Sequence, residues 1–243
     1  MSDTDPSKPR RPSFSAAARA ITIVKVKQRS YYIHQDFLTH YSPYFRAALE
    51  GPFKDAEEGV MSLSNVSTCT FDMFVNWLYT QEFPTPDEDP TPLGDPAYRT
   101  NFGRDGNLMT ENLIDLYIFA DGHDTPLLRR DVINQMCQRY WSQQPSYKAI
   151  INTFSRLSKS SPLRRFLIDS YCNDFNMGID DIELRALLPN DCLFGVMLRH
   201  ADKILELNGD KKVCEAYALH PCDYHEHANT AEDEQCKMKR RRL

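Results

Sequence analysis

The feature that most constrains the fold is a β-branched run near the start of the chain, Ile21–Val26. Its length and its Ile, Val and Thr content predict a strand. The polar residues 27–30 predict a turn, and Tyr31–His34 predicts the returning strand of a hairpin. Val60–Leu63 predicts one more short strand. A sheet this small cannot close on itself, so we expect helices to cover its inner face.

The helices are predicted by their first residues and by apolar side chains at helical spacing. Ser42 can accept from first-turn amides and Pro43 suits the first helical position, so a short helix is expected there. Thr125 and Pro126 predict the start of a later helix in the same way. Apolar residues at i, i+3, i+4 and i+7 predict one stripe on each of three helices: Phe71, Phe74, Val75 and Leu78; Leu113, Leu116, Tyr117 and Ala120; Ile133, Met136, Cys137 and Tyr140.

Composition indicates where regular structure gives way. Residues 1–18 are rich in Ser, Pro, Lys and Arg without hydrophobic periodicity, and we expect them to be disordered. The stretch from about 81 to 110 holds five Pro and three Gly, which predicts a surface insertion. Residues 145–210 return to helical spacing and predict a helical extension. Its last helix is expected to contribute these core contacts: Leu193, Val196, Met197 and Ile204.

The order hairpin, short helices, short strand and paired helices resembles a BTB/POZ domain, particularly the short fungal type without Kelch, MATH or zinc-finger arrays. The resemblance covers residues 20–140 and implies an α+β fold, a small sheet capped by helices, followed by the all-α extension. It rests on these segments in this order: Ile21–Val26, Tyr32-Ile33-His34, Phe37-Leu38, Ser42-Pro43-Tyr44-Phe45, Phe53-Lys54-Asp55, Val60-Met61-Ser62-Leu63, Phe71 through Trp77-Leu78-Tyr79-Thr80, and Leu113 through Ala120-Asp121.

The resemblance implies a protein–protein interaction module with protein partners. BTB domains commonly form homodimers, and many hold a substrate receptor on a cullin scaffold. The cullin-binding members dock against the scaffold through a three-residue motif, which consists of a hydrophobic residue, any residue and then Glu. Phe53 and Asp55 stand at those positions here, with the acid one methylene shorter. Three alternatives stay open: a self-associating module, an adaptor of a cullin ubiquitin ligase, and a nuclear transcriptional co-regulator.

The sequence gives no support for catalysis. It contains no Gly-rich phosphate loop, no Gly-x-Ser-x-Gly elbow and no His-Glu-x-x-His helix, so we expect no enzyme. His34 follows a strand and precedes a helix, where a hydrogen-bonded structural role is expected. Trp77 and Tyr79 lie on the face of a predicted helix. Aromatic residues in such a place usually pack in a core or an interface, so we interpret both in this way.

The most unusual chemistry lies in residues 214–243, a Cys/His-bearing and basic tail. Cys222, His225, His227 and Cys236 offer two thiols and two imidazoles, the ligand set of a structural zinc site. Cys214 is a substitute ligand. The segment after residue 224 has almost no hydrophobic side chain, so zinc is the cofactor that could order it. The alternative is a solvated acidic tail that happens to carry histidines.

The chain ends in a basic cluster that predicts nuclear import, with a solvated charge run as the alternative. The net charge is −5, so no direct sequence-specific binding of nucleic acid is expected. No apolar run reaches the roughly 18 residues of a membrane span, and no secretory signal precedes the first strand. The protein is therefore expected inside the cell, in the cytoplasm or the nucleus. The basic cluster that predicts nuclear import comprises Lys237, Lys239, Arg240, Arg241 and Arg242.

Overall fold

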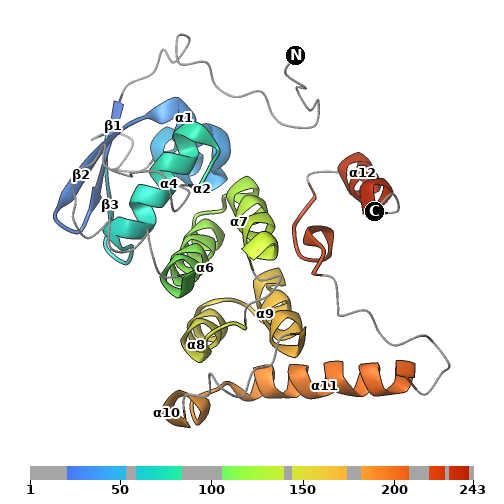
Figure 1. The fold of residues 1–243 in the computed structure, drawn as a ribbon. Helices are drawn as coiled ribbons and strands as arrows, with labels where there is room; N and C mark the ends of the chain where they lie inside the picture. Colours follow the sequence, from blue (N-terminus) through green and yellow to red (C-terminus); the bar gives the residue numbers. More distant parts are fainter. Residues whose placement is uncertain are drawn as a thin grey trace. The chain divides into compact units, whose positions relative to one another are not determined.

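Strands and helices alternate in the first part of the chain, and helices alone follow (Figure 1). The computed structural model describes residues 21–52, 59–83, 106–139, 144–173, 182–207, 219–227 and 230–240. Two compact units are present: one contains the sheet together with residues 119–128 and α12, and the other contains residues 105–118 and 129–226. The elements are β1 (Ile21–Val26), β2 (Arg29–His34), α1 (Gln35–Tyr41), α2 (Pro43–Glu50), β3 (Val60–Leu63), α4 (Thr68–Thr80), α6 (Gly106–Gly122), α7 (Pro126–Arg139), α8 (Tyr147–Arg156), α9 (Pro162–Asn173), α10 (Ile182–Arg185), α11 (Asn190–Leu207), the 3-10 turn η4 (Pro221–Asp223) and α12 (Thr230–Arg240).

The sheet has the strand order β2-β1-β3. β1 and β2 form the predicted antiparallel hairpin, with Ile21 opposite His34 at its open end. Lys27 adopts the left-handed conformation, with a φ of 53°, as the tight turns that match strand twist require. The turn is shorter than the predicted 27–30 because β2 already begins at Arg29. β3 runs parallel to β1, and α1 and α2 lie on the connection that a parallel pair needs.

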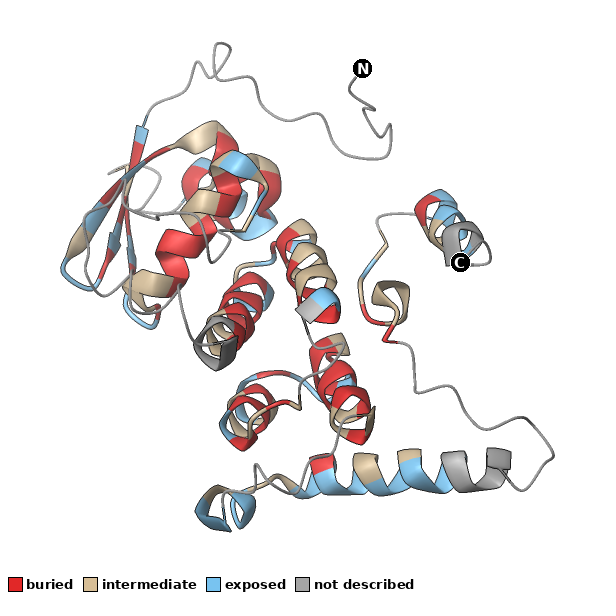
Figure 2. Ribbon diagram, in the orientation of Figure 1, coloured by how far each residue is buried: buried red, intermediate tan, exposed pale blue. Residues whose placement is uncertain are grey.

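One face of the sheet is buried under helices. Val24, Val26 and Ile33 are at most 1% exposed, and α1 packs on α4 and beside β2. Figure 2 shows buried residues along most of α4, whose Trp77 is fully buried next to α1 residue Tyr41. Burying one large apolar side chain contributes about 1.5–3 kcal/mol. The α+β fold with a small sheet capped by helices is confirmed, and Trp77 belongs to its core.

Two hydrogen-bonded links fix β2 to α4. Asp72, only 2% exposed, accepts from Tyr31 Oη at 2.8 Å and from Arg29 Nη1 at 3.0 Å. Burial and the Asp72 carboxylate raise the pKa of Tyr31, so its hydroxyl stays a donor. At the other end of the strand, Tyr79 Oη accepts from the His34 amide at 3.1 Å and lies 2.9 Å from His34 Nδ1. The hydrogen-bonded structural role expected for His34 is confirmed.

The predicted helix starts are present. Ser42 Oγ accepts from the Phe45 amide at 3.1 Å, and Pro43 is the first residue of α2. The same Ser42 hydroxyl donates to the carbonyl of His123 at 2.6 Å. α7 begins at Pro126, as expected.

The second unit is built from helices, as predicted for the extension. Ser146 Oγ accepts from the Ala149 amide at 3.2 Å and starts α8. α9 packs against both α8 and α11. The small core at the centre of this packing is formed by Tyr147, Ile150 and Cys192, with Phe154, Ile168, Tyr171, Leu184, Leu188 and Val196 around them.

Two of the core contacts predicted for α11 are wrong. Leu193 is 44% exposed and Met197 is 65% exposed. Val196 packs against the small core, as predicted. The stripe that faces α9 also contains Cys192 and Arg199, so its members lie at i, i+4 and i+7. Apolar periodicity favours the outer stripe of α11, because this stripe is more hydrophobic than the inner stripe, which contains an Arg.

Several predictions fall on residues outside the described part of the chain. These are the disordered segment 1–18, most of the insertion at 81–110, the side chain of Ile204, and Cys214. Among the described helices, none combines the length and the apolar character that crossing a bilayer requires.

Candidate functional site

The four residues predicted as zinc ligands lie together. One ligand atom from each of Cys222, His225, His227 and Cys236 lies within 4.8 Å of the other three, and all four side chains are half-buried. All four belong to one short stretch, 222–236, in which η4 leads into α12. This is the one group of metal-ligating side chains found among the described residues.

The local backbone explains how Cys222 and His225 come to share one side of a turn. His220 Nδ1 accepts from the Cys222 amide at 3.2 Å and starts η4. The Pro221 carbonyl then accepts from the amides of Tyr224 at 3.0 Å and His225 at 2.9 Å. The chain is thereby folded tightly enough for a Cys-x-x-His pair to direct both ligand atoms to one point.

Oxygen atoms outside the cluster lie beside Nδ1 of both imidazoles, one of them within hydrogen-bonding distance. His225 Nδ1 lies 2.8 Å from Asn134 Oδ1, which can only accept, so Nδ1 carries the proton and Nε2 keeps its lone pair. Asp233 Oδ1 lies 3.6 Å from His227 Nδ1. Metal-binding histidines usually have an amide or carboxylate oxygen in this position on the ring nitrogen that does not bind the metal.

Tyr224, between the two ligands of the turn, anchors the segment to α9. Its hydroxyl donates to Asp169 Oδ2 at 2.8 Å, and its ring meets Phe166 edge-on at 5.2 Å. Arg165 lies over the same ring at 5.3 Å. Burial and then the Asp169 carboxylate raise the pKa of Tyr224, so the phenol remains a donor. Asp169 also accepts from Arg199 Nη2 of α11 at 2.7 Å, so one buried carboxylate joins three segments.

A second anchor joins the segment to α7. Arg129 donates twice to Glu226, from Nε at 3.1 Å and from Nη2 at 2.8 Å. This paired geometry is the strongest form of the Arg–carboxylate interaction, although Glu226 is exposed. With the bond from Asn134, α7 contributes two contacts to this segment.

Among the described residues of the predicted import signal, Lys237 lies outside the cluster. Lys237 is exposed and donates to Asp233 at 2.6 Å, one helical turn away. Lys239 and Arg240 lie on α12 with side chains outside the described part, as are Arg241 and Arg242. The import prediction therefore stays a prediction.

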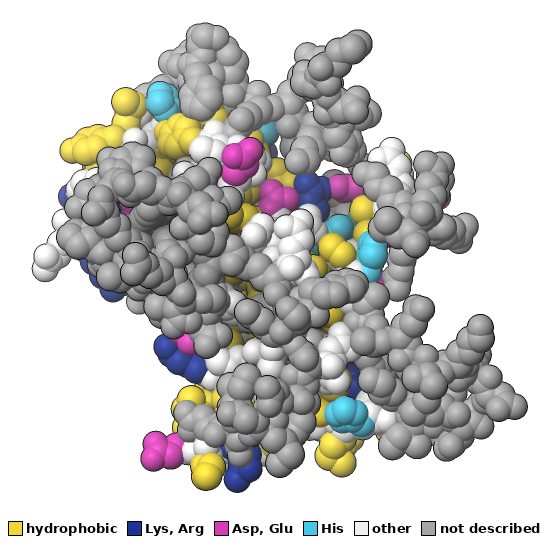
Figure 3. All heavy atoms as spheres, viewed as in Figure 1, with side chains coloured by type: hydrophobic (Ala, Val, Ile, Leu, Met, Phe, Trp, Pro, Cys, Tyr) yellow, Lys and Arg dark blue, Asp and Glu magenta, His cyan; other side chains and the backbone are white. Residues whose placement is uncertain are grey.

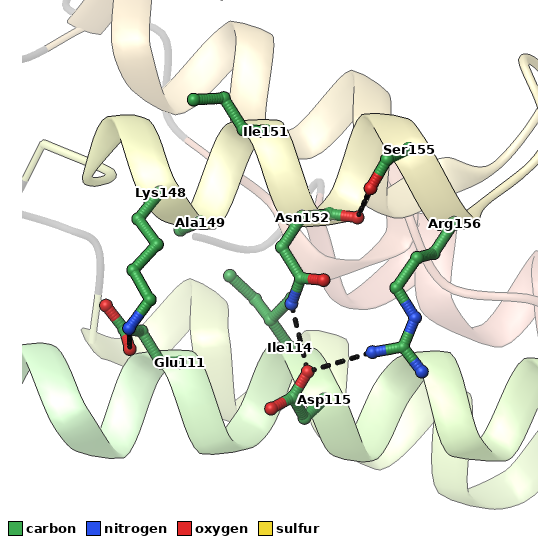
Figure 4. Close-up of a pocket in the computed structure, with 9 residues that line it drawn as sticks. All are labelled: Glu111, Ile114, Asp115, Lys148, Ala149, Ile151, Asn152, Ser155 and Arg156. Carbon is green, nitrogen blue, oxygen red and sulfur yellow. Dashed lines mark hydrogen bonds and ion pairs between the residues drawn. The ribbon is translucent and has the colours of Figure 1, made fainter. Parts of the chain in front are cut away.

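An open groove lies between α6 and α8 (Figure 4). Lys148 donates to Glu111 at 2.7 Å, and Asn152 and Arg156 donate to Asp115 at 2.9 and 3.3 Å. The polar groups thus cross-link the two helices and leave no convergent set for catalysis among the residues drawn. These contacts were not predicted, although the i, i+4 spacing of the charged and polar residues on both helices is a signal for them.

The comparisons with known proteins bear on the first part of the chain. The family model of the BTB/POZ domain matches residues 21–94. This chain contains a BTB/POZ domain. The comparison with curated proteins found no match. The match begins at β1 and includes α4, and the extension of the domain to residue 140 stays a prediction.

The BTB/POZ domain supports a role in protein–protein interaction, because BTB domains are typically interaction modules. Phe53 and Asp55, the predicted cullin-docking residues, lie within the matched region but outside the described residues.

Hydrophobic side chains are exposed on both units, over the sheet and over α11 (Figure 3). On the BTB domain these are Ile21 and Tyr32 of the sheet and Tyr44 of α2. On α11 the exposed hydrophobic residues form one outer stripe, which comprises Leu193, Phe194, Met197 and Leu198.

Proposed function

We propose that this BTB protein acts as a homodimeric bridge between proteins and that the outer face of its sheet forms the dimer contact. The observation that carries the proposal is the pair Ile21 and Tyr32, which are 55% and 69% exposed. Ile23 lies directly opposite Tyr32 in the hairpin and is half-buried, so the three side chains form one apolar patch. Exposed aromatic and aliphatic residues gathered in this way are typical of protein interfaces.

Light scattering after gel filtration tests the proposal. We expect a mass of twice the 28.1 kDa of one chain, and a shift toward the single chain mass when Ile21→Ser and Tyr32→Ser are combined. Lys25→Ser is the matched control, because Lys25 is exposed on the same strand and lies outside the apolar patch. If the measured mass of the unchanged protein were 28.1 kDa at every protein concentration, the proposal would be refuted.

A second proposed activity is docking on a cullin scaffold. Phe53 supplies the hydrophobic anchor and Asp55 the acid two residues later, which supports this role. Phe53→Ala combined with Asp55→Lys should abolish capture of the scaffold in a pull-down. If the double variant captured the scaffold as well as the unchanged protein does, docking at these residues would be excluded.

The third proposal is a nuclear co-regulator that is imported through its basic end. The exposed Lys237 on α12, followed by Lys239 and three arginines, supports it. A fluorescent fusion of the full chain should accumulate in nuclei, and deletion of residues 237–243 should abolish this accumulation. Equal distribution of both fusions would rule the signal out.

A further inference from the structure

We propose that Cys222, His225, His227 and Cys236 bind one structural Zn²⁺, and that this ion orders the stretch 222–236 that contains them. The inference goes beyond the proposed function, since the BTB sheet and this segment use different residues. Two thiolates would neutralise the charge of the ion, two imidazoles would complete its tetrahedron, and the two thiol protons would pass to solvent. A closed set of four protein ligands leaves no position for substrate, so the ion is structural.

The dimensions of the cluster suit this ion. Zinc binds sulfur at about 2.3 Å and nitrogen at about 2.0–2.1 Å, so the edges of a tetrahedral site measure roughly 3.3–3.8 Å. The four ligand atoms already lie within 4.8 Å of one another, so only small side-chain movements are needed. Magnesium and calcium are unsuited, because they require oxygen ligands.

The surroundings of the cluster provide the support that a metal site requires. Asn134 holds the Nδ1 proton of His225, which leaves Nε2 of this imidazole for the ion. The Asp233 carboxylate lies near His227, with Oδ1 3.6 Å from Nδ1.

The composition of the segment explains why an ion is needed. Leu219 and Tyr224 are the large apolar side chains that it buries among the described residues. α12 buries only Glu232 among its described residues, and an isolated helix of 11 residues is marginal in water. Cys236 lies two turns into α12, so bonding its sulfur to zinc would stabilise most of the helix.

Metal content of the full chain, purified with a thiol reductant and without chelator, tests the site. We expect one zinc per chain in the unchanged protein and less than a tenth of that in Cys222→Ser combined with Cys236→Ser. Cys69→Ser and His200→Gln serve as controls, because both residues lie outside the cluster, and each should retain one zinc. Cobalt added to metal-free protein should give the visible bands of tetrahedral thiolate coordination, and His227→Gln should change them.

A second measurement covers the case in which the double variant does not fold. Chelator added to the unchanged protein should increase amide hydrogen exchange at 219–236 at least tenfold while leaving α4 unchanged. Zinc should restore protection, and magnesium should not. The proposal is overturned if the reduced protein contains no zinc, if the double variant retains it, if exchange ignores the chelator, or if Cys222 and Cys236 are joined in a disulfide under reducing conditions.

Discussion

At the scale of single residues, His123 shows how a titratable side chain can be part of an aromatic core. Its ring stacks on Phe119 at 4.2 Å and on Phe45 at 5.6 Å, and its Nδ1 lies 2.8 Å from the Phe119 carbonyl. Burial lowers the pKa of His123, although this hydrogen bond opposes the shift. Burial and then the nearby Arg46 guanidinium lower the pKa of His40 as well. Both imidazoles are therefore neutral in the fold.

The lowered pKa values predict that the protein is destabilised by mild acid. The unfolded chain binds these protons near pH 6.5, and the folded chain binds them only at lower pH. The contribution of these two histidines to the free energy of unfolding is therefore fully present above pH 6.5. It is lost as the pH falls toward their pKa values in the folded protein. Each histidine contributes at most about 1.4 kcal/mol per pH unit to the loss.

Urea unfolding at pH 7.5 and pH 5.5 measures this effect. His123→Gln should reduce the difference between the two free energies of unfolding, whereas the exposed His200→Gln should leave it unchanged. The Cys/His cluster is the same in both variants, so its own response to acid cancels in the comparison. Equal differences in the two variants would show that His123 titrates normally in the fold.

At the scale of elements, the packing of α9 against α11 depends on a glycine. A Cβ at Gly195 would lie 2.5 Å from Cδ1 of Ile168, closer than real contacts allow. Asp169 then accepts from Arg199 one turn further along, so the close approach and the ion pair lie on the same face.

The close approach predicts that a larger residue at position 195 is destabilising. Gly195→Leu should lower the free energy of unfolding by about 1–3 kcal/mol, because overpacking forces both helices to shift. Gly122→Leu is the control: no atom lies within 4 Å of a Cβ there, so a change within about 0.5 kcal/mol is expected. Chemical denaturation monitored by circular dichroism gives both values. If Gly195→Leu left the free energy of unfolding unchanged, the two helices would be able to move apart at little cost.

At the scale of the whole molecule, the apolar patch of the BTB sheet and the Cys/His cluster have no residue in common. Ile21, Ile23 and Tyr32 belong to the hairpin, whereas the cluster lies in 222–236. The two proposals are therefore separable by experiment.

This separation predicts that metal removal leaves the oligomeric state unchanged. Chelator should not alter the mass found by light scattering, because the ion contributes nothing to the sheet face. Ile21→Ser with Tyr32→Ser should in turn retain the zinc content of the unchanged protein. A chelator-induced change of mass would show that the C-terminal segment contributes to the dimer contact.

Much of the fold could be predicted because its signals are local. The β-branched run and its return predicted the hairpin, and Ser42 with Pro43 predicted the start of α2. The four ligands were predicted because all of them fall within fifteen consecutive residues, where a turn can bring them together. Their chemistry is a property of the side chains and needs no distant partner to be recognised.

The remaining features depend on contacts between residues far apart in the chain. The parallel pairing of β3 with β1, the hydrogen bond of Tyr224 to Asp169 and the buried stripe of α11 have no local signal. The pattern of α11 favours Leu193 and Met197 for the core, but Arg199 is turned inward because Asp169 offers it a buried carboxylate. The sequence by itself determined most of the elements and which Cys and His residues are candidate metal ligands. The tertiary structure decided which faces are buried, because burial depends on what each face meets.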